Sequence, residues 1–175
     1  MSLIFLLAAC DDGTFSFGSA KDDGSGALGS EACDESIVPG DIVGPDCLSG
    51  ALVCGETVTN TTEGGEPSLH GGDYQSWYCM TSEDTDWTGN ERMYEFVHPG
   101  TGSITVSLSS PCGALQLIAM AWSDEESCPY PGVGVLECEA DSDTLEIWNN
   151  SQTRYVLIID GESDQPFSLG VTCPS

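Results

Sequence analysis

Basic residues are nearly absent from this sequence of 175 residues. It holds three Lys plus Arg against 29 Asp plus Glu, which gives a formal net charge of −26. Nucleic acids and anionic lipid headgroups attract proteins through clustered cations, so the composition argues against both kinds of partner. We interpret the acidity as a means of staying soluble in a salty or crowded exterior. Divalent-cation binding and attraction to a basic partner are the alternatives.

Histidine is also scarce, and the motifs of common catalytic chemistry are missing. The two histidines are His70, in a Gly-rich loop, and His98, in a His-Pro-Gly turn. Neither has the spacing of a zinc motif, and the sequence contains no nucleophile elbow, P-loop or dinucleotide fingerprint. We therefore expect both histidines to be solvated loop residues, and we expect a protein that is not an enzyme and needs no cofactor.

Long apolar segments are missing as well. The apolar start, residues 2–9, is far shorter than the about 20 residues that a helix needs to cross a bilayer. It ends in Leu7-Ala8-Ala9-Cys10, which has the form of a bacterial lipobox. Small side chains before the cysteine let a signal peptidase approach the backbone, and the thiol receives a diacylglycerol. The motif predicts lipidation of Cys10 and a place in the bacterial cell envelope, anchored to the outer membrane and either periplasmic or surface-exposed.

The sequence is rich in cysteine, with nine in all. An odd number in an exported chain leaves one thiol to explain, and acylation of Cys10 accounts for it. The other eight can form four disulfides, which persist outside the cytosol. We expect Cys128 and Cys138 to pair across a hairpin, because they flank a Pro/Gly-rich segment. The other six cysteines can pair in 15 ways, which the sequence does not resolve. Among these we prefer Cys33–Cys47, Cys54–Cys173 and Cys79–Cys112.

Composition divides the chain into four parts. Residues 1–9 form the signal segment, and residues 10–32 are acidic and rich in Gly and Ser, which favours a flexible tether. Residues 33–50 are a lead-in bracketed by two cysteines. The folded domain is expected over residues 51–175.

Apolar residues in this domain recur with period two, as in half-buried strands. Ile104, Val106 and Leu108 alternate with Thr105 and Ser107. The stretch 167–171 alternates in the same way, and the continuous apolar run 155–159 predicts a central strand. No window of a dozen residues has a helical stripe. Further strands are predicted at Leu52–Val58, Tyr74–Cys79, Arg92–Val97, Leu115–Trp122, Gly134–Cys138 and Thr144–Trp148. Many short strands predict an all-β fold, a disulfide-stabilised β-sandwich of the jelly-roll type.

The run 89–96, GNERMYEF, has the pattern G-x-E-x-x-Y-x-F. Together with the order of the strands that follow, it resembles bacterial pre-peptidase C-terminal domains and their disulfide-bearing lipoprotein relatives. The resemblance covers about residues 50–175 and implies a jelly-roll-like β-sandwich. Some relatives bind calcium, but Ala114-Leu115-Gln116 replaces an acidic D-L-D motif here, which speaks against the transfer of a calcium site.

Candidate ligand-binding residues lie in the polar loops. Asp84 with Asp86, and Asp141 with Asp143, are the candidate calcium ligands, since calcium binds clustered oxygen atoms at turns. Trp87 lies in a polar loop and is the candidate for an exposed contact, such as stacking on a sugar ring.

The sequence thus favours a lipid-anchored, non-catalytic module that binds or displays a protein or polysaccharide at the cell surface. The alternatives are a structural subunit of a surface assembly and an accessory or inhibitor domain in a secreted protease system. The oligomeric state is not predicted.

Overall fold

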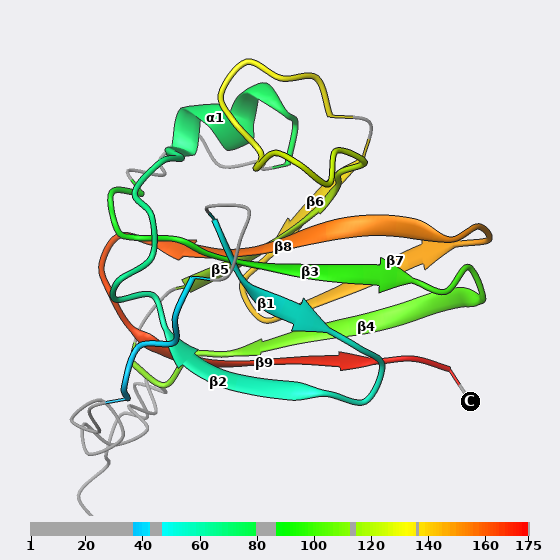
Figure 1. Cartoon of the computed structure of the whole chain (residues 1–175), viewed down its shortest axis with the longest axis horizontal. Helices are drawn as coiled ribbons and strands as arrows, with labels where there is room; N and C mark the ends of the chain where they lie inside the picture. The colour runs from blue at the N-terminus through cyan, green and yellow to red at the C-terminus, as the bar shows by residue number, and fades with distance from the viewer. Residues whose placement is uncertain (1–36, 43–46, 80–86, 113–114, 136, 175) are drawn as a thin grey trace, which may run out of the picture.

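The computed structural model describes residues 37–42, 47–79, 87–112, 115–135 and 137–174. These residues form one short helix and a series of strands (Figure 1). In chain order the elements are β1 (Leu48–Leu52), β2 (Thr57–Thr61), α1 (Gly71–Ser76), β3 (Arg92–His98), β4 (Gly102–Ser109), β5 (Leu115–Ala121), β6 (Cys138–Asp141), β7 (Thr144–Asn149), β8 (Thr153–Gly161) and β9 (Pro166–Thr172).

The strands form two sheets packed face to face, which confirms the predicted β-sandwich. Sheet A has the strand order β1-β3-β8-β5-β6, and sheet B has the order β2-β9-β4-β7. Only the β1–β3 pair is parallel among the pairings within these sheets. The inner faces of both sheets meet in one apolar core that includes Phe96, Val106, Leu157 and Leu169.

The period-two pattern explains why sheet B is buried on one face. In β4 the side chains of Ile104, Val106 and Leu108 are buried, whereas Ser103 and Ser107, at the alternate positions of the strand, are exposed. Strand β8 differs because its residues 155–161 are all buried. It lies between β3 and β5, as expected of a central strand covered on both faces.

A second apolar cluster covers the outer face of sheet A. It includes Leu69, Tyr74 and Trp77 from α1 and its approach, packed against Met93 and Ile118 of the sheet. Figure 1 shows α1 and the loop between β5 and β6 on one side of the molecule, with β2 and β9 on the opposite side. The described part of the chain contains no helix that is long and apolar enough to cross a membrane.

Three predicted strands are wrong. Residues 52–58 were expected to form one strand, but β1 ends at Leu52 and β2 begins only at Thr57, and Gly55 with its φ of +83° lies in the turn between them. Residues 74–79 were expected to be extended, but α1 ends at Ser76 and carries Tyr74 into the second cluster. Asp73 favours this helix, since its carboxylate accepts the His70 backbone N–H at 2.9 Å. Helical spacing also places Tyr74 and Trp77 on the same side, whereas a strand would place them on opposite faces.

The third wrong strand is 134–138, because β6 begins only at Cys138. The preceding loop packs on α1, where the Trp77 indole Nε1–H donates to the Val133 carbonyl at 2.8 Å. The loop's backbone is therefore used for contacts with the helix and does not add a strand to sheet A.

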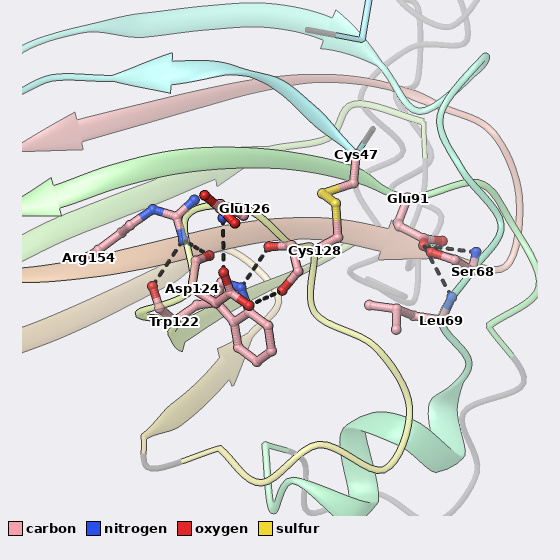
Figure 2. Close-up of a disulfide and its surroundings, with 10 residues drawn as sticks. Cys47, Ser68, Leu69, Glu91, Trp122, Asp124, Glu126, Cys128 and Arg154 are labelled. Carbon is pink, nitrogen blue, oxygen red and sulfur yellow. Dashed lines mark hydrogen bonds between the residues drawn. A yellow bond between two sulfur atoms is a disulfide. The ribbon is translucent and has the colours of Figure 1, made fainter. Parts of the chain in front are cut away.

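Three disulfides join the described residues: Cys47–Cys128, Cys54–Cys173 and Cys79–Cys138. The Cys54–Cys173 bond was predicted. The predicted Cys128–Cys138 bond is wrong, because the intervening segment is a loop over α1 and not a hairpin. That loop brings Cys128 to Cys47 just before β1, as Figure 2 shows, and Cys138 to Cys79 just after α1.

The predicted Cys33–Cys47 and Cys79–Cys112 bonds are wrong as well. Cys47 and Cys79 already have the partners just named, and Cys33 lies outside the described residues. Cys79 follows α1 on the outer side of sheet A, whereas Cys112 follows β4 of sheet B, so the two are on different layers. Cys112 is itself disulfide-bonded.

Candidate binding face

Hydroxyl side chains cover the outer face of sheet B, and we call this surface the hydroxyl face. Because alternate residues of each strand point inward to the core, the intervening Ser and Thr side chains point outward. The exposed or half-exposed members are Thr57, Thr59, Ser103, Thr105, Ser107, Ser109, Thr144, Ser168 and Thr172.

The strand register aligns these hydroxyls in rows across the sheet. One row contains Thr59, Ser168 and Ser109, which are successive partners on β2, β9 and β4. Within it, the hydroxyls of Thr59 and Ser168 are hydrogen-bonded at 3.0 Å. Neighbouring strands lie about 4.8 Å apart, and alternate residues of a strand about 6.8 Å apart. The hydroxyl face thus presents donors and acceptors at regular intervals.

Glycine occupies the middle of the next row. Gly170 is the partner of Thr57 on one side and of Ser107 on the other. A Cβ atom at this position would lie 3.1 Å from Thr57 Oγ1 and 3.3 Å from Ser107 Oγ. The two hydroxyls therefore lie close to the outer side of Gly170 from both neighbouring strands. Because glycine has no side chain, nothing stands between them in this row.

Charge is almost excluded from this face. Glu146 is the one charged side chain among the outward positions of β2, β4, β7 and β9, although the sequence contains 29 Asp and Glu. An aromatic residue stands at the edge of the face. Trp148, on the edge strand β7, is the partner of Ser103 and is 64% exposed. The surface combines neutral hydroxyls with one exposed indole ring.

A groove lies elsewhere, over the end of sheet A. It has a volume of about 310 Å³ and is lined in part by Ala121, Trp122, Ser123 and Arg154. The Arg154 guanidinium donates to Glu95 Oε2 at 2.8 Å and to the Trp122 and Asp124 carbonyls at 3.0 and 2.9 Å. Figure 2 shows Arg154 beside these two carbonyl-bearing residues. Its bonds hold the loop after β5 in place.

Two carboxylates are buried beneath α1. Glu91 Oε1 accepts from the backbone N–H groups of Ser68 and Leu69 and from the Ser68 hydroxyl, at 2.9, 3.1 and 2.5 Å (Figure 2). Asp160 Oδ2 accepts the Tyr74 hydroxyl at 2.7 Å. Burial raises the pKa of Glu91 to about 7 and that of Asp160 to about 6. These acids hold loops together inside the protein.

The sequence reasoning missed this pair. Asp160 is fully buried at the end of β8, although it is an acidic residue in a strongly acidic chain. The signal that could have found it is its place directly after the continuous apolar run of the central strand.

Two predictions of exposure are wrong. Trp87 is only 5% exposed, because its ring packs against Tyr74 with the ring centres 5.1 Å apart. His98 is fully buried between Phe96 and Tyr155, and its Nδ1 accepts the Gly100 N–H at 2.9 Å. His70 is exposed, as expected.

The structure leaves the other candidate site residues untested. Asp141 and Asp143 lie at the exposed turn between β6 and β7, where Asp141 Oδ1 accepts the Asp143 N–H at 3.2 Å. Cys10, Asp84 and Asp86 lie outside the described residues. No group of three His, Cys, Asp or Glu residues that could hold a metal ion exists in the described part of the chain. Calcium binding stays a prediction.

Comparison with known proteins identifies no family. No family model matches the sequence, and no curated protein matches it. One similar solved structure is Aeromonas hydrophila PliG, a periplasmic lysozyme inhibitor of g-type lysozyme. It is 10% identical, the match covers 68% of this chain and 85% of that chain, and the TM-score is 0.41.

Another is the pre-peptidase C-terminal domain of collagenase from Bacillus anthracis. It is 13% identical, the match covers 78% of this chain and 100% of that chain, and the TM-score is 0.40. At this level of similarity neither structure bears on the function of this chain. The fold and the hydroxyl face define a disulfide-stabilised β-sandwich whose sheet B has an almost uncharged outer face.

Proposed function

We propose that this protein is a non-catalytic binding module of the bacterial cell envelope, held by a lipid on Cys10, and that it binds its ligand through the hydroxyl face. The observation that carries the proposal is that Glu146 is the one charged side chain on the hydroxyl face, in a chain of net charge −26. Exposed carboxylates improve solubility wherever they lie on a protein. Selection for solubility alone therefore gives no reason to keep carboxylates off this face.

Three further observations support the proposal. Disulfides such as Cys54–Cys173 are typical of proteins outside the cytosol. The perturbed carboxylates Glu91 and Asp160 are buried among loop contacts, so neither faces a ligand as a general acid or base would. The lipobox of residues 7–10 supports the anchor.

The binding part of the proposal is tested with a charge placed in the middle of the face. The full chain carrying Cys10→Ser, which we expect to be soluble, is mixed with envelopes of the producing bacterium and sedimented. Ser107→Glu should abolish co-sedimentation, because a carboxylate on the central strand β4 must lose its hydration when a ligand covers it. Ser123→Glu is the matched control, since it adds the same charge at an exposed serine beside the groove of sheet A.

Equal co-sedimentation of the two variants would contradict binding through the hydroxyl face. The anchor is tested separately by labelling cells with a radioactive fatty acid. The unaltered chain should take up the label and fractionate with membranes, and Cys10→Ser should do neither.

A further inference from the structure

The ligand that best complements the hydroxyl face is itself rich in hydroxyl groups and carries no charge. Resting on the function proposed above, we propose that the hydroxyl face binds a neutral polysaccharide, with the chain lying across the rows of Ser and Thr and one sugar ring stacked on Trp148.

The distribution of charge on the protein argues against both anionic and cationic ligands. A phosphorylated, sulfated or uronic acid polymer would be repelled by the 29 acidic residues of the chain. A cationic partner would find only Glu146 to pair with among the outward strand positions of sheet B. A neutral ligand meets neither obstacle, and covering the face requires the desolvation of a single carboxylate.

Hydrogen bonding favours a ligand with many hydroxyls. Each Ser or Thr hydroxyl both donates and accepts, as does each sugar hydroxyl, so the two can pair in either direction. The rows repeat along and across the strands, as in the Thr59–Ser168–Ser109 row. A polymer with repeating hydroxyls can therefore make several weak contacts at once, and affinity grows with the number of contacts.

Trp148 supplies the apolar contact that hydroxyls lack. Its ring is 64% exposed, whereas Trp77, Trp87 and Trp122 are 5%, 5% and 6% exposed. A pyranose ring has an apolar face of C–H groups that packs on an indole, while its ring hydroxyls point sideways. Because Trp148 is the partner of Ser103, a sugar stacked on it would extend directly onto the hydroxyl rows.

The test is affinity electrophoresis of the Cys10→Ser chain through native gels that contain a dissolved polysaccharide. The gels contain a neutral glucan, a neutral mannan, a neutral galactan or, as the anionic control, polygalacturonate. We expect retardation by at least one neutral polymer and none by polygalacturonate. Fluorescence of the exposed Trp148 should shift to shorter wavelength on addition of the retarding polymer.

Variants then assign the contact. Trp148→Ala should weaken retardation about tenfold, Trp148→Phe should keep most of it, and Ser107→Glu should abolish it. Tyr130→Ala is the matched control, since Tyr130 is an exposed aromatic residue in the loop packed on α1, away from sheet B. Thermal melts check that each variant is folded.

The outcomes separate this inference from the proposed function. If no neutral polymer retards the protein while Ser107→Glu still abolishes envelope binding, the ligand is of another class and the inference is wrong. Retardation by polygalacturonate equal to that by the neutral polymers would also overturn it, as would a dimer in solution that Ser107→Glu dissociates. If the Ser107→Glu variant keeps both envelope binding and retardation by the polysaccharide, the proposed function is wrong as well.

Discussion

At the scale of single residues, the interior of this acidic protein holds ionisable groups that its loops depend on. Arg92 is 1% exposed and Glu91, its neighbour in sequence, is 2% exposed. Each forms hydrogen bonds with a different set of backbone groups, which would otherwise lack these partners. Their removal should therefore affect stability far more than the removal of any surface charge.

The first prediction concerns Glu91 and pH. Burial raises the pKa of this carboxyl from 4.5 to about 7, so between these values the folded protein binds a proton that the unfolded chain has released. Stability must therefore fall as pH rises through this range, and Asp160, with its pKa raised to about 6, acts in the same direction. Urea unfolding at pH 5 and pH 8 should show a lower free energy of unfolding at pH 8.

Glu91→Gln should reduce this difference, because a neutral amide does not titrate while its carbonyl oxygen still accepts the bonds from Ser68 and Leu69. Glu125→Gln, at an exposed position, is the control and should leave the pH dependence almost unchanged. The same slope in Glu91→Gln and in the unaltered protein would refute the assignment.

The second prediction concerns Arg92, whose side chain connects strand β3 to three other segments of the chain. Its guanidinium donates to the Thr61, Gly40 and Glu63 carbonyls at 3.0, 2.8 and 2.5 Å, and to the Ser49 hydroxyl at 3.2 Å. Arg92→Met should lower the free energy of unfolding by about 3 kcal/mol or more, since the buried Thr61 carbonyl and the part-buried Gly40 and Glu63 carbonyls lose their donors.

Arg92→Lys should recover little of this loss, because an ammonium group does not reproduce the fork of donors. Arg154→Met is the comparison variant. The Arg154 side chain is 9% exposed and that of its ion-pair partner Glu95 is 31% exposed, and the carbonyl of Asp124 that it also binds is exposed, so its loss should be smaller than that of Arg92→Met. Urea unfolding measures the stability of all three variants. If Arg92→Met lowers the free energy of unfolding no more than Arg154→Met does, Arg92 does not have this stabilising role.

At the scale of elements, the helix and the long loop after β5 matter because they cover the outer face of sheet A. Tyr74 and Trp77 of this layer pack on the sheet, and Trp77 holds the loop at Val133. Disulfides fix the layer at two points, Cys47–Cys128 and Cys79–Cys138. Sheet A is thereby buried on both faces, and sheet B remains as the exposed surface of the sandwich.

The third prediction concerns these two bonds. Digestion without reduction should release one peptide pair joined through Cys47 and Cys128 and another joined through Cys79 and Cys138. The Cα atoms of the pairs lie 6.1 and 4.9 Å apart, within the range of disulfides. The double variant Cys47→Ala, Cys128→Ala should lose roughly 2–4 kcal/mol of stability, because the bond closes a long loop. A peptide pair joined through Cys128 and Cys138 would disprove the connectivity.

At the scale of the whole molecule, charge is distributed unevenly over a strongly acidic surface. Carboxylates such as Asp141 and Asp143 lie at the turns, and the face of sheet B is left almost neutral. Under the function proposed above, this separation leaves one side of the sandwich open to a neutral ligand while the acidic turns stay hydrated.

The fourth prediction concerns calcium. Asp141 Oδ1 already accepts the Asp143 N–H, and both residues are exposed to water. We therefore expect thermal melts in millimolar calcium and in magnesium at equal ionic strength to agree within the error of the measurement. A bound ion would instead raise the melting temperature with the logarithm of the calcium concentration. A calcium-specific rise that is lost in Asp141→Asn, Asp143→Asn would contradict the expectation.

Local periodicity predicted most of sheet B and the centre of sheet A. The alternation of Ile104 to Leu108 and of 167–171 marks β4 and β9, and the apolar run 155–159 marks β8. It did not predict α1, because six residues are too short for a helical stripe to differ from a strand pattern. Nor did it predict the exposure of Trp148 or the burial of Trp87, because both depend on what packs against each ring.

The sequence by itself determined the acidity, most of the strands and the alternation of apolar with hydroxyl side chains, because each is a property of the chain or of neighbouring residues. Only the tertiary structure decided that the hydroxyls of β2, β4 and β9 meet in rows, because strand order joins residues as distant as Thr59 and Ser168. It likewise decided the disulfides. The cysteines nearest in sequence, Cys47 with Cys54 and Cys128 with Cys138, are carried to different elements by the loops between them, and pairing depends on distance in space.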